Sequence, residues 1–146
     1  MDVIVIGAGP TGLVLAHELA LCGAEVVVVE RLAERIRQVK GGAIQPRTSE
    51  LLDARGLLAA IEERALERTN TGGHFAALPV SLDCANWGTR HPYPIAVPQW
   101  AIEDALADAV VGRGVEVLRD HPVTAVEQDD TGVTVTAGGV ELRAAY

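Results

Sequence analysis

DVIVIGAGPTG, residues 2–12, is the stretch that decides the fold of this chain. Val3–Ile6 is a short, continuous run of β-branched residues, the pattern of a buried parallel strand. Residues 10–22 are mostly helix formers, and Gly23 is placed to end the helix. Residues 25–29 are a second β-branched run. Strand, helix and strand in close succession predict a right-handed βαβ unit and an α/β, Rossmann-like fold with a parallel sheet.

The three glycines of this stretch, Gly7, Gly9 and Gly12, match the pattern G-x-G-x-x-G between a predicted strand and a predicted helix. Gly7 permits a sharp turn, Gly9 lets a pyrophosphate approach the backbone, and Gly12 allows the helix to pack closely on the strand. The helix begins with Pro10 and Thr11, and its first turn offers free N–H groups and a partial positive charge to phosphates. These residues predict a dinucleotide site.

Glu30 stands at the end of the second predicted strand, where an acidic residue accompanies the glycine pattern. Its carboxylate can accept hydrogen bonds from ribose hydroxyls and would repel a 2′-phosphate, so NADP is disfavoured here. The alternative is that the glycines only make a tight turn and that Glu30 is a surface acid. The motif predicts a dinucleotide and leaves FAD and NAD both open.

The middle of the chain is less regular. Residues 31–45 form a predicted charged loop, and the next two segments are predicted helices at 46–55 and 57–66. Glycines and prolines then punctuate residues 69–98, which indicates an excursion of loops with short strands such as 75–82. A helix over 99–111 and a third strand over 115–118 follow.

The end of the chain predicts an antiparallel meander. Its strands are expected at 123–127, 133–136 and 140–144, separated by the turn sequences Asp129-Asp130-Thr131-Gly132 and Gly138-Gly139. An NAD-dependent dehydrogenase domain would instead continue with further strand–helix units. The meander therefore favours a flavoprotein.

The amino-acid composition of the chain disfavours some classes of binding partner. Lys and Arg total 12 against 20 Asp and Glu, a net charge of −8 that disfavours nucleic acid. Cys22 and Cys84 lie far apart, so neither a disulfide framework nor a metal site is expected, and Cys22 is predicted to be a small buried side chain. The N-terminus lacks a basic signal-peptide region and no stretch is long enough to span a membrane, which predicts a cytosolic protein.

The sequence resembles the class A flavin monooxygenases, the para-hydroxybenzoate hydroxylase group, and within it the aromatic polyketide and antibiotic hydroxylases. The matching stretches run along the whole chain: DVIVIGAGPTG at 2–12, VVVVER at 26–31, RTSELLDARGLL at 47–58, GGHFAAL at 72–78, VPQ at 97–99, GVTV at 132–135 and LRAAY at 142–146. The first stretch is shared by many flavoproteins, whereas the ordered series is more specific.

The resemblance implies FAD as cofactor, NADPH as reductant and an aromatic small molecule as substrate. Glu30 would bind the adenosine ribose, Arg31 would cover the adenine, and Gln99 would contact the ribityl or phosphate region of the flavin. Arg47 would be a phosphate contact. Lys40 stands where the family usually has arginine and keeps the charge without the planar fork, so a two-pronged phosphate contact is not expected there.

Simpler interpretations exist for the same residues. Gln99 can serve as a helix cap, and the cations Arg31, Lys40 and Arg47 can be solvated surface charges. His74 is interpreted as a loop histidine, because no second catalytic group lies near it in the sequence. The sequence therefore identifies no catalytic residue.

Residues 1–146 are interpreted as one incomplete FAD-binding domain, with 69–98 reaching toward a substrate domain. Members of the family are longer and carry further Asp-Gly and Gly-Asp motifs after a segment like Leu142 to Tyr146. The isolated chain is therefore expected to be inactive, and the remaining portion could act as a separate partner chain. A non-catalytic nucleotide-binding module is the other open alternative.

Overall fold

The computed structural model describes residues 1–37, 41–68, 79 and 83–146. They form two compact units, one of Met1–Arg37 with Leu106–Tyr146 and the other of Gln38–Ala105. The boundary falls inside helix α4, Gln99–Gly112. Among the described residues, no helix is both long enough and apolar enough to cross a membrane.

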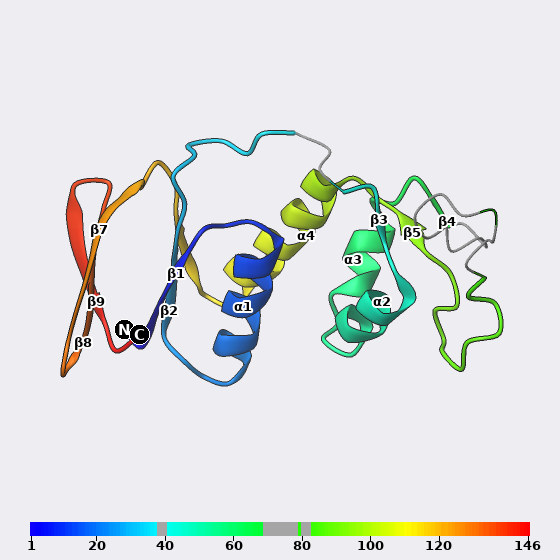
Figure 1. Cartoon of the computed structure of the whole chain (residues 1–146), viewed down its shortest axis with the longest axis horizontal. Coiled ribbons are helices and arrows are strands. Elements are labelled where there is room, and N and C mark those ends of the chain that lie inside the picture. Colours follow the sequence, from blue (N-terminus) through cyan, green and yellow to red (C-terminus); the bar gives the residue numbers. More distant parts are fainter. Residues whose placement is uncertain (38–40, 69–78, 80–82) are drawn as a thin grey trace. The chain divides into compact units, whose positions relative to one another are not determined.

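A parallel sheet forms the centre of the first unit (Figure 1). Its strands are β1, Val3–Ile6, β2, Val26–Val29, and β6, Glu116–Leu118, in the order β1-β2-β6. The predicted βαβ unit and its parallel pairing are confirmed. The four valines of β2 are all buried, because both faces of this central strand are covered by other elements of the unit.

Helix α1, Pro10–Leu21, joins β1 to β2 and packs on both strands. It buries one face, formed by Leu13, Ala16 and His17, against the unit. The chain leaves the helix through Gly23, whose φ of 85° suits a residue without a side chain. The prediction that Cys22 is buried was wrong: Cys22 lies one residue past the helix, on this turn, and is exposed.

The predicted meander is confirmed by three antiparallel strands, β7, Val123–Asp129, β8, Gly132–Ala137, and β9, Val140–Ala144. Buried side chains of β8 and β9 form one core cluster with Ile4, Val27 and Val29 of the parallel sheet. Figure 1 shows the parallel sheet between α1 and this meander. The parallel sheet is packed between α1 and the meander, and this packing holds the carboxyl ends of β1 and β2 in place.

The second unit contains a small antiparallel sheet and short helices. Its sheet has the order β3-β5-β4, with two residues in each strand: Ala43–Ile44, Ile95–Ala96 and Glu67–Arg68. The expectation of an unbroken loop over 31–45 was therefore wrong at Ala43–Ile44. Two helices follow β3, namely α2, Pro46–Asp53, and α3, Leu58–Glu62.

Helix α3 is shorter than the segment predicted from the sequence. The N–H of Leu66 donates to the carbonyl of Ala96 at 2.8 Å, and the next two residues pair with β5. Sheet pairing thus takes over backbone groups that a longer helix would use itself. The strand predicted over 75–82 lies almost wholly outside the described residues.

Candidate cofactor site

The glycine-rich turn connects β1 to the first turn of α1. Gly7 has a φ of 103°, a conformation that favours glycine, and its N–H donates to the carbonyl of Val29 at 2.8 Å. Gly9 is the extended N-cap residue, and Pro10 occupies the first turn beside the exposed Thr11. No side chain in the described part of the chain caps this helix, so its first N–H groups remain available to an anion.

Gly9 and Gly12 have different surroundings. A Cβ atom on Gly9 would have no described neighbour within 4 Å, so the backbone there faces open space that a ligand can enter. A Cβ atom on Gly12 would overlap the carbonyl oxygen of Gly7 and lie 3.4 Å from Cγ1 of Val5. This geometry supports ligand approach at Gly9 and close helix–strand packing at Gly12.

The Glu30 carboxylate is fixed beside the glycine-rich turn. Oε2 accepts a hydrogen bond from the N–H of Ala8 at 2.8 Å, and Oε1 accepts one from the N–H of Leu32 at 2.9 Å. A carboxylate offers about four acceptor positions, so lone pairs remain for ribose hydroxyls. The contact with Ala8, which the sequence did not reveal, holds the acidic residue against the turn.

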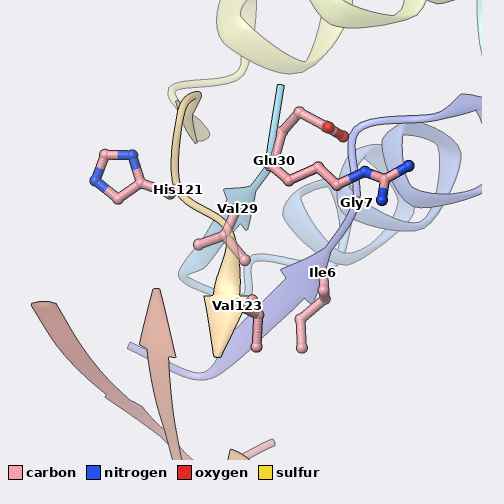
Figure 2. A pocket seen from close by; sticks show the side chains of 7 residues that line it. Ile6, Gly7, Val29, Glu30, His121 and Val123 are labelled. Carbon is pink, nitrogen blue, oxygen red and sulfur yellow. The ribbon is translucent and has the colours of Figure 1, made fainter. Parts of the chain in front are cut away.

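A cavity of about 240 Å³ opens at this end of the sheet and is drawn in Figure 2. Its lining combines apolar and polar side chains: Ile6, Gly7, Val29, Glu30, Arg31, His121 and Val123. The apolar part suits the flat face of a base, and the polar part suits ribose hydroxyls. The structure therefore brings Glu30 and Arg31 together with the glycine-rich turn.

Sequence reasoning missed His121 and Val123. They follow β6, which pairs with β2 in parallel, and the N–H of His121 donates to the carbonyl of Glu30 at 2.9 Å. Ligands of open α/β sheets bind beyond the carboxyl ends of the strands. The strand predicted at 115–118 could therefore have pointed to His121 and Val123, because a parallel strand there places the residues after 118 at the same edge of the sheet as Glu30.

Gln99 lies in the second unit at the start of α4. Its Nε2 donates to Oε1 of Glu103 at 2.8 Å, and its N–H donates to the carbonyl of Gly41 at 3.2 Å. Glu103 is buried, with 8% of its surface exposed. Because a carboxylate only accepts, it fixes the amide with its NH₂ group toward Glu103 and leaves Oε1 as an acceptor on the other side of the amide.

Of the two remaining predicted phosphate contacts, the structure describes Arg47 and not Lys40. Arg47 is exposed, and its NH1 donates to Oε2 of Glu50 at 2.8 Å, which holds the pKa of the Glu50 carboxyl below its ordinary value. This pair is compatible with a surface charge as well as with a phosphate contact. Lys40 and His74 lie outside the described residues.

No group of three His, Cys, Asp or Glu side chains in the described ranges could hold a metal ion. The glycine-rich turn, the fixed carboxylate and the cavity together fit the ADP half of a dinucleotide.

Comparison with known proteins identifies the family. Residues 1–146 match the family described as FAD binding domain. Anhydrotetracycline monooxygenase of Streptomyces rimosus is 49% identical over 140 residues, which are 96% of this chain and 27% of that protein. The chain spans less than a third of the length of the curated relatives it matches.

Solved structures give the same result. OxyS anhydrotetracycline hydroxylase from Streptomyces rimosus has a TM-score of 0.93 and 45% identity over 99% of this chain and 30% of that one. The Diels–Alderase PyrE3 of pyrroindomycin biosynthesis has a TM-score of 0.90 and 34% identity over 99% of this chain and 31% of that one. The resemblance to the class A aromatic hydroxylases is confirmed, and the chain belongs to the FAD-binding domain family.

Proposed function

We propose that this chain is the FAD-binding part of a flavin-dependent monooxygenase that uses NAD(P)H and hydroxylates an aromatic, polyketide-like small molecule. The observation that carries the proposal is the cavity at the glycine-rich turn, with Glu30 fixed at its edge, in a chain of the FAD-binding domain family. Support for the reaction comes from the relatives, several of which are named as monooxygenases of anhydrotetracycline or rifampicin.

The first unit would hold the ADP half of FAD. The pyrophosphate would lie over Gly9 at the N-terminus of α1, and the Glu30 carboxylate would accept hydrogen bonds from the adenosine ribose. Arg31 lines the same cavity and would face the adenine. When bound, the flavin supplies the oxidation chemistry, while these residues bind and orient the cofactor.

The second unit would contact the flavin half. Gln99 presents Oε1 as an acceptor, which suits the hydroxyl donors of the ribityl chain better than a phosphate, itself an acceptor. Arg47 and Lys40 would contribute positive charge toward the pyrophosphate. We assign no catalytic acid or base within this chain, and we propose the cytosol as its compartment because NAD(P)H is the reductant.

The direct test is titration of the purified protein with FAD, followed by flavin fluorescence and thermal unfolding. We expect saturable binding of one FAD and a weakening of about tenfold or more in Glu30→Gln, since hydrogen bonds to charged groups are the stronger ones. NAD is the control ligand. A folded protein that bound NAD and not FAD would overturn the proposal in favour of the dehydrogenase alternative.

A second candidate function has a specific observation behind it. PyrE3, whose structure matches this chain, is described as a Diels–Alderase, and a dialkyldecalin synthase of Streptomyces rugosporus is 36% identical over 96% of the chain. A protein of this family can therefore catalyse ring formation. Because the isolated chain is expected to be inactive, the test adds the remaining portion as a partner chain. NADPH oxidation stimulated by an aromatic polyketide would then support the monooxygenase, whereas ring formation without such oxidation would support the second candidate.

A further inference from the structure

The backbone of Glu30 is held from both sides by the segment that follows β6. The Glu30 N–H donates to the carbonyl of Leu118 at 2.8 Å, and the Glu30 carbonyl accepts a hydrogen bond from the N–H of His121 at 2.9 Å. Because these two bonds lie on either side of the Glu30 Cα atom, they restrict the direction in which its side chain can point. The residue that would bind the ribose is therefore positioned by a segment much later in the chain.

The turn that carries the His121 N–H to Glu30 has an uncommon backbone. Asp120, the residue before His121, has a φ of 58°, in the left-handed region that non-glycine residues rarely adopt. Its N–H donates to the carbonyl of Leu32 at 3.4 Å. A residue with a side chain keeps such a conformation only where the surrounding contacts impose it. The contacts of the neighbouring His121 side chain are of this kind.

The His121 ring is packed against the turn between β8 and β9. Figure 2 shows the imidazole pointing away from the cavity. Its Nδ1 lies 2.6 Å from the carbonyl oxygen of Arg119, and because a carbonyl only accepts, Nδ1 carries the proton. A Cβ atom on Gly138 would lie 2.6 Å from Cδ2 of His121 and 2.9 Å from Cγ. The ring thus occupies space that a side chain at Gly138 would fill.

These contacts form a continuous path from the β8–β9 turn to the Glu30 carboxylate. Gly138 leaves room for the ring, the ring fixes His121, and the His121 N–H holds the Glu30 backbone. The carboxylate is then held by the N–H groups of Ala8 and Leu32. We propose that His121 is a positioning residue of the cofactor site, which sets Glu30 for the adenosine ribose and acts through Glu30 alone. This inference rests on the proposed FAD function and adds to it a residue outside the glycine-rich motif.

The test measures how well the protein distinguishes ADP from 2′-deoxy-ADP, which lacks a hydroxyl that a correctly placed Glu30 carboxylate would bind. By isothermal titration calorimetry, the wild-type protein is expected to bind ADP about tenfold more tightly, because hydrogen bonds to charged groups are the stronger ones. In His121→Ala the ring is absent, and in Gly138→Ala a methyl group displaces it. Both variants are expected to reduce the preference for ADP to about threefold or less.

Two further variants separate positioning from a general effect on the fold. His121→Asn keeps a side-chain N–H that can donate to the Arg119 carbonyl, and it should retain most of the preference for ADP. In a Glu30→Gln background, His121→Ala should change the ratio of the two affinities little further, because its effect passes through Glu30. A contact that served stability alone would not change this ratio in folded protein.

Gly139→Ala is the matched control for Gly138→Ala. Both glycines have left-handed backbones, with φ of 58° at Gly138 and 82° at Gly139, so alanine strains the turn at either position. A Cβ atom on Gly139 would have no described neighbour within 4 Å, and the His121 ring would stay in place. Gly139→Ala should therefore keep the wild-type preference for ADP.

The outcomes distinguish this inference from the proposed function. A wild-type preference for ADP in folded His121→Ala would overturn the role of His121 and leave the cofactor site intact. Equal affinities of the wild-type protein for ADP and 2′-deoxy-ADP would also overturn this inference alone. Failure of the wild-type protein to bind ADP and FAD would overturn the proposed function and this inference together.

Discussion

Gly9 and Gly12 belong to one motif but perform separable tasks. A methyl group at Gly12 would overlap the Gly7 carbonyl, whereas one at Gly9 would meet open space. We expect Gly12→Ala to lower the free energy of unfolding by about 1–3 kcal/mol, as overpacking does, and to be measurable by urea denaturation. Gly9→Ala should change stability by less than about 1 kcal/mol, since its φ of −78° suits alanine.

The same pair separates folding from binding. Gly9→Ala places a methyl group where the pyrophosphate is expected, so FAD affinity should fall in a protein of nearly native stability. If Gly9→Ala bound FAD like the wild type, the phosphates would have to lie elsewhere, and the assignment of the glycine-rich turn would be wrong.

Glu103 provides a second prediction at this scale. Removal of its carboxylate in Glu103→Ala frees the Gln99 amide to rotate, and we expect FAD affinity to fall by about 3- to 10-fold. Glu103→Gln keeps a carbonyl acceptor and should recover most of that loss. ADP affinity, measured in parallel, should not change, because Gln99 is expected to face the ribityl chain.

How far single residues can be predicted depends on how local their signal is. Their spacing in the sequence identifies Gly7, Gly9, Gly12 and Glu30 as cofactor-site residues, because the role of each depends on the turn between one strand and one helix. His121 has no such motif. Its place beside Glu30 follows from pairing between β2 and β6, two strands separated by most of the chain.

At the scale of elements, the turn between β7 and β8 is closed by a polar network around Asp129. Oδ1 of Asp129 accepts hydrogen bonds from NH2 of Arg143 at 2.6 Å and from the hydroxyl and N–H of Thr131. These bonds, that of Arg143 first, hold the pKa of Asp129 well below its ordinary value. Arg143 therefore links β9 to the turn that joins the other two strands.

We expect Arg143→Met to raise the Asp129 pKa toward the ordinary value of 3.8, which carboxyl-carbon NMR titration would measure. A carboxyl whose pKa is lowered by folding stabilises the native state above its unfolded pKa, and that contribution is lost as the pH falls below it. The stability difference between wild type and variant should accordingly shrink below about pH 4. Arg119→Met is the control, and an unchanged Asp129 pKa in Arg143→Met would contradict the network.

Longer elements were predictable and the shortest were not. The runs that became β1, β2, β7 and β8 have enough β-branched residues and turn signals to be located from sequence. The strands β3, β4 and β5 contain two residues each, too few for any periodicity. A strand this short forms only where a partner strand is available for hydrogen bonding. Its own sequence does not show where that partner lies.

At the scale of the whole molecule, the predicted cofactor contacts divide between the two units. Glu30 belongs to the first and Gln99 to the second. We expect Glu30→Gln to weaken ADP and FAD by a similar factor, because both ligands contain the adenosine ribose. Gln99→Ala should weaken FAD by about 3- to 10-fold and leave ADP unchanged.

Competition titrations with the two ligands would measure both effects. Loss of ADP affinity in Gln99→Ala would assign this residue to the pyrophosphate, and an unchanged FAD affinity would assign it to helix capping alone. The sequence resemblance predicts which residues contact the cofactor. It contains no distances, so the division between units emerges only from the folded chain.

The central strand β2 has a consequence for how the protein is made. Its four consecutive valines are buried in the finished fold, yet one of its neighbours, β6, lies far later in the chain. During synthesis one edge of the apolar strand β2 stays unpaired until β6 has been made, and exposed edges of this kind promote aggregation. Shortened versions that end before Glu116–Leu118 should therefore accumulate as inclusion bodies, and chaperone supply should govern the yield of the longer chain.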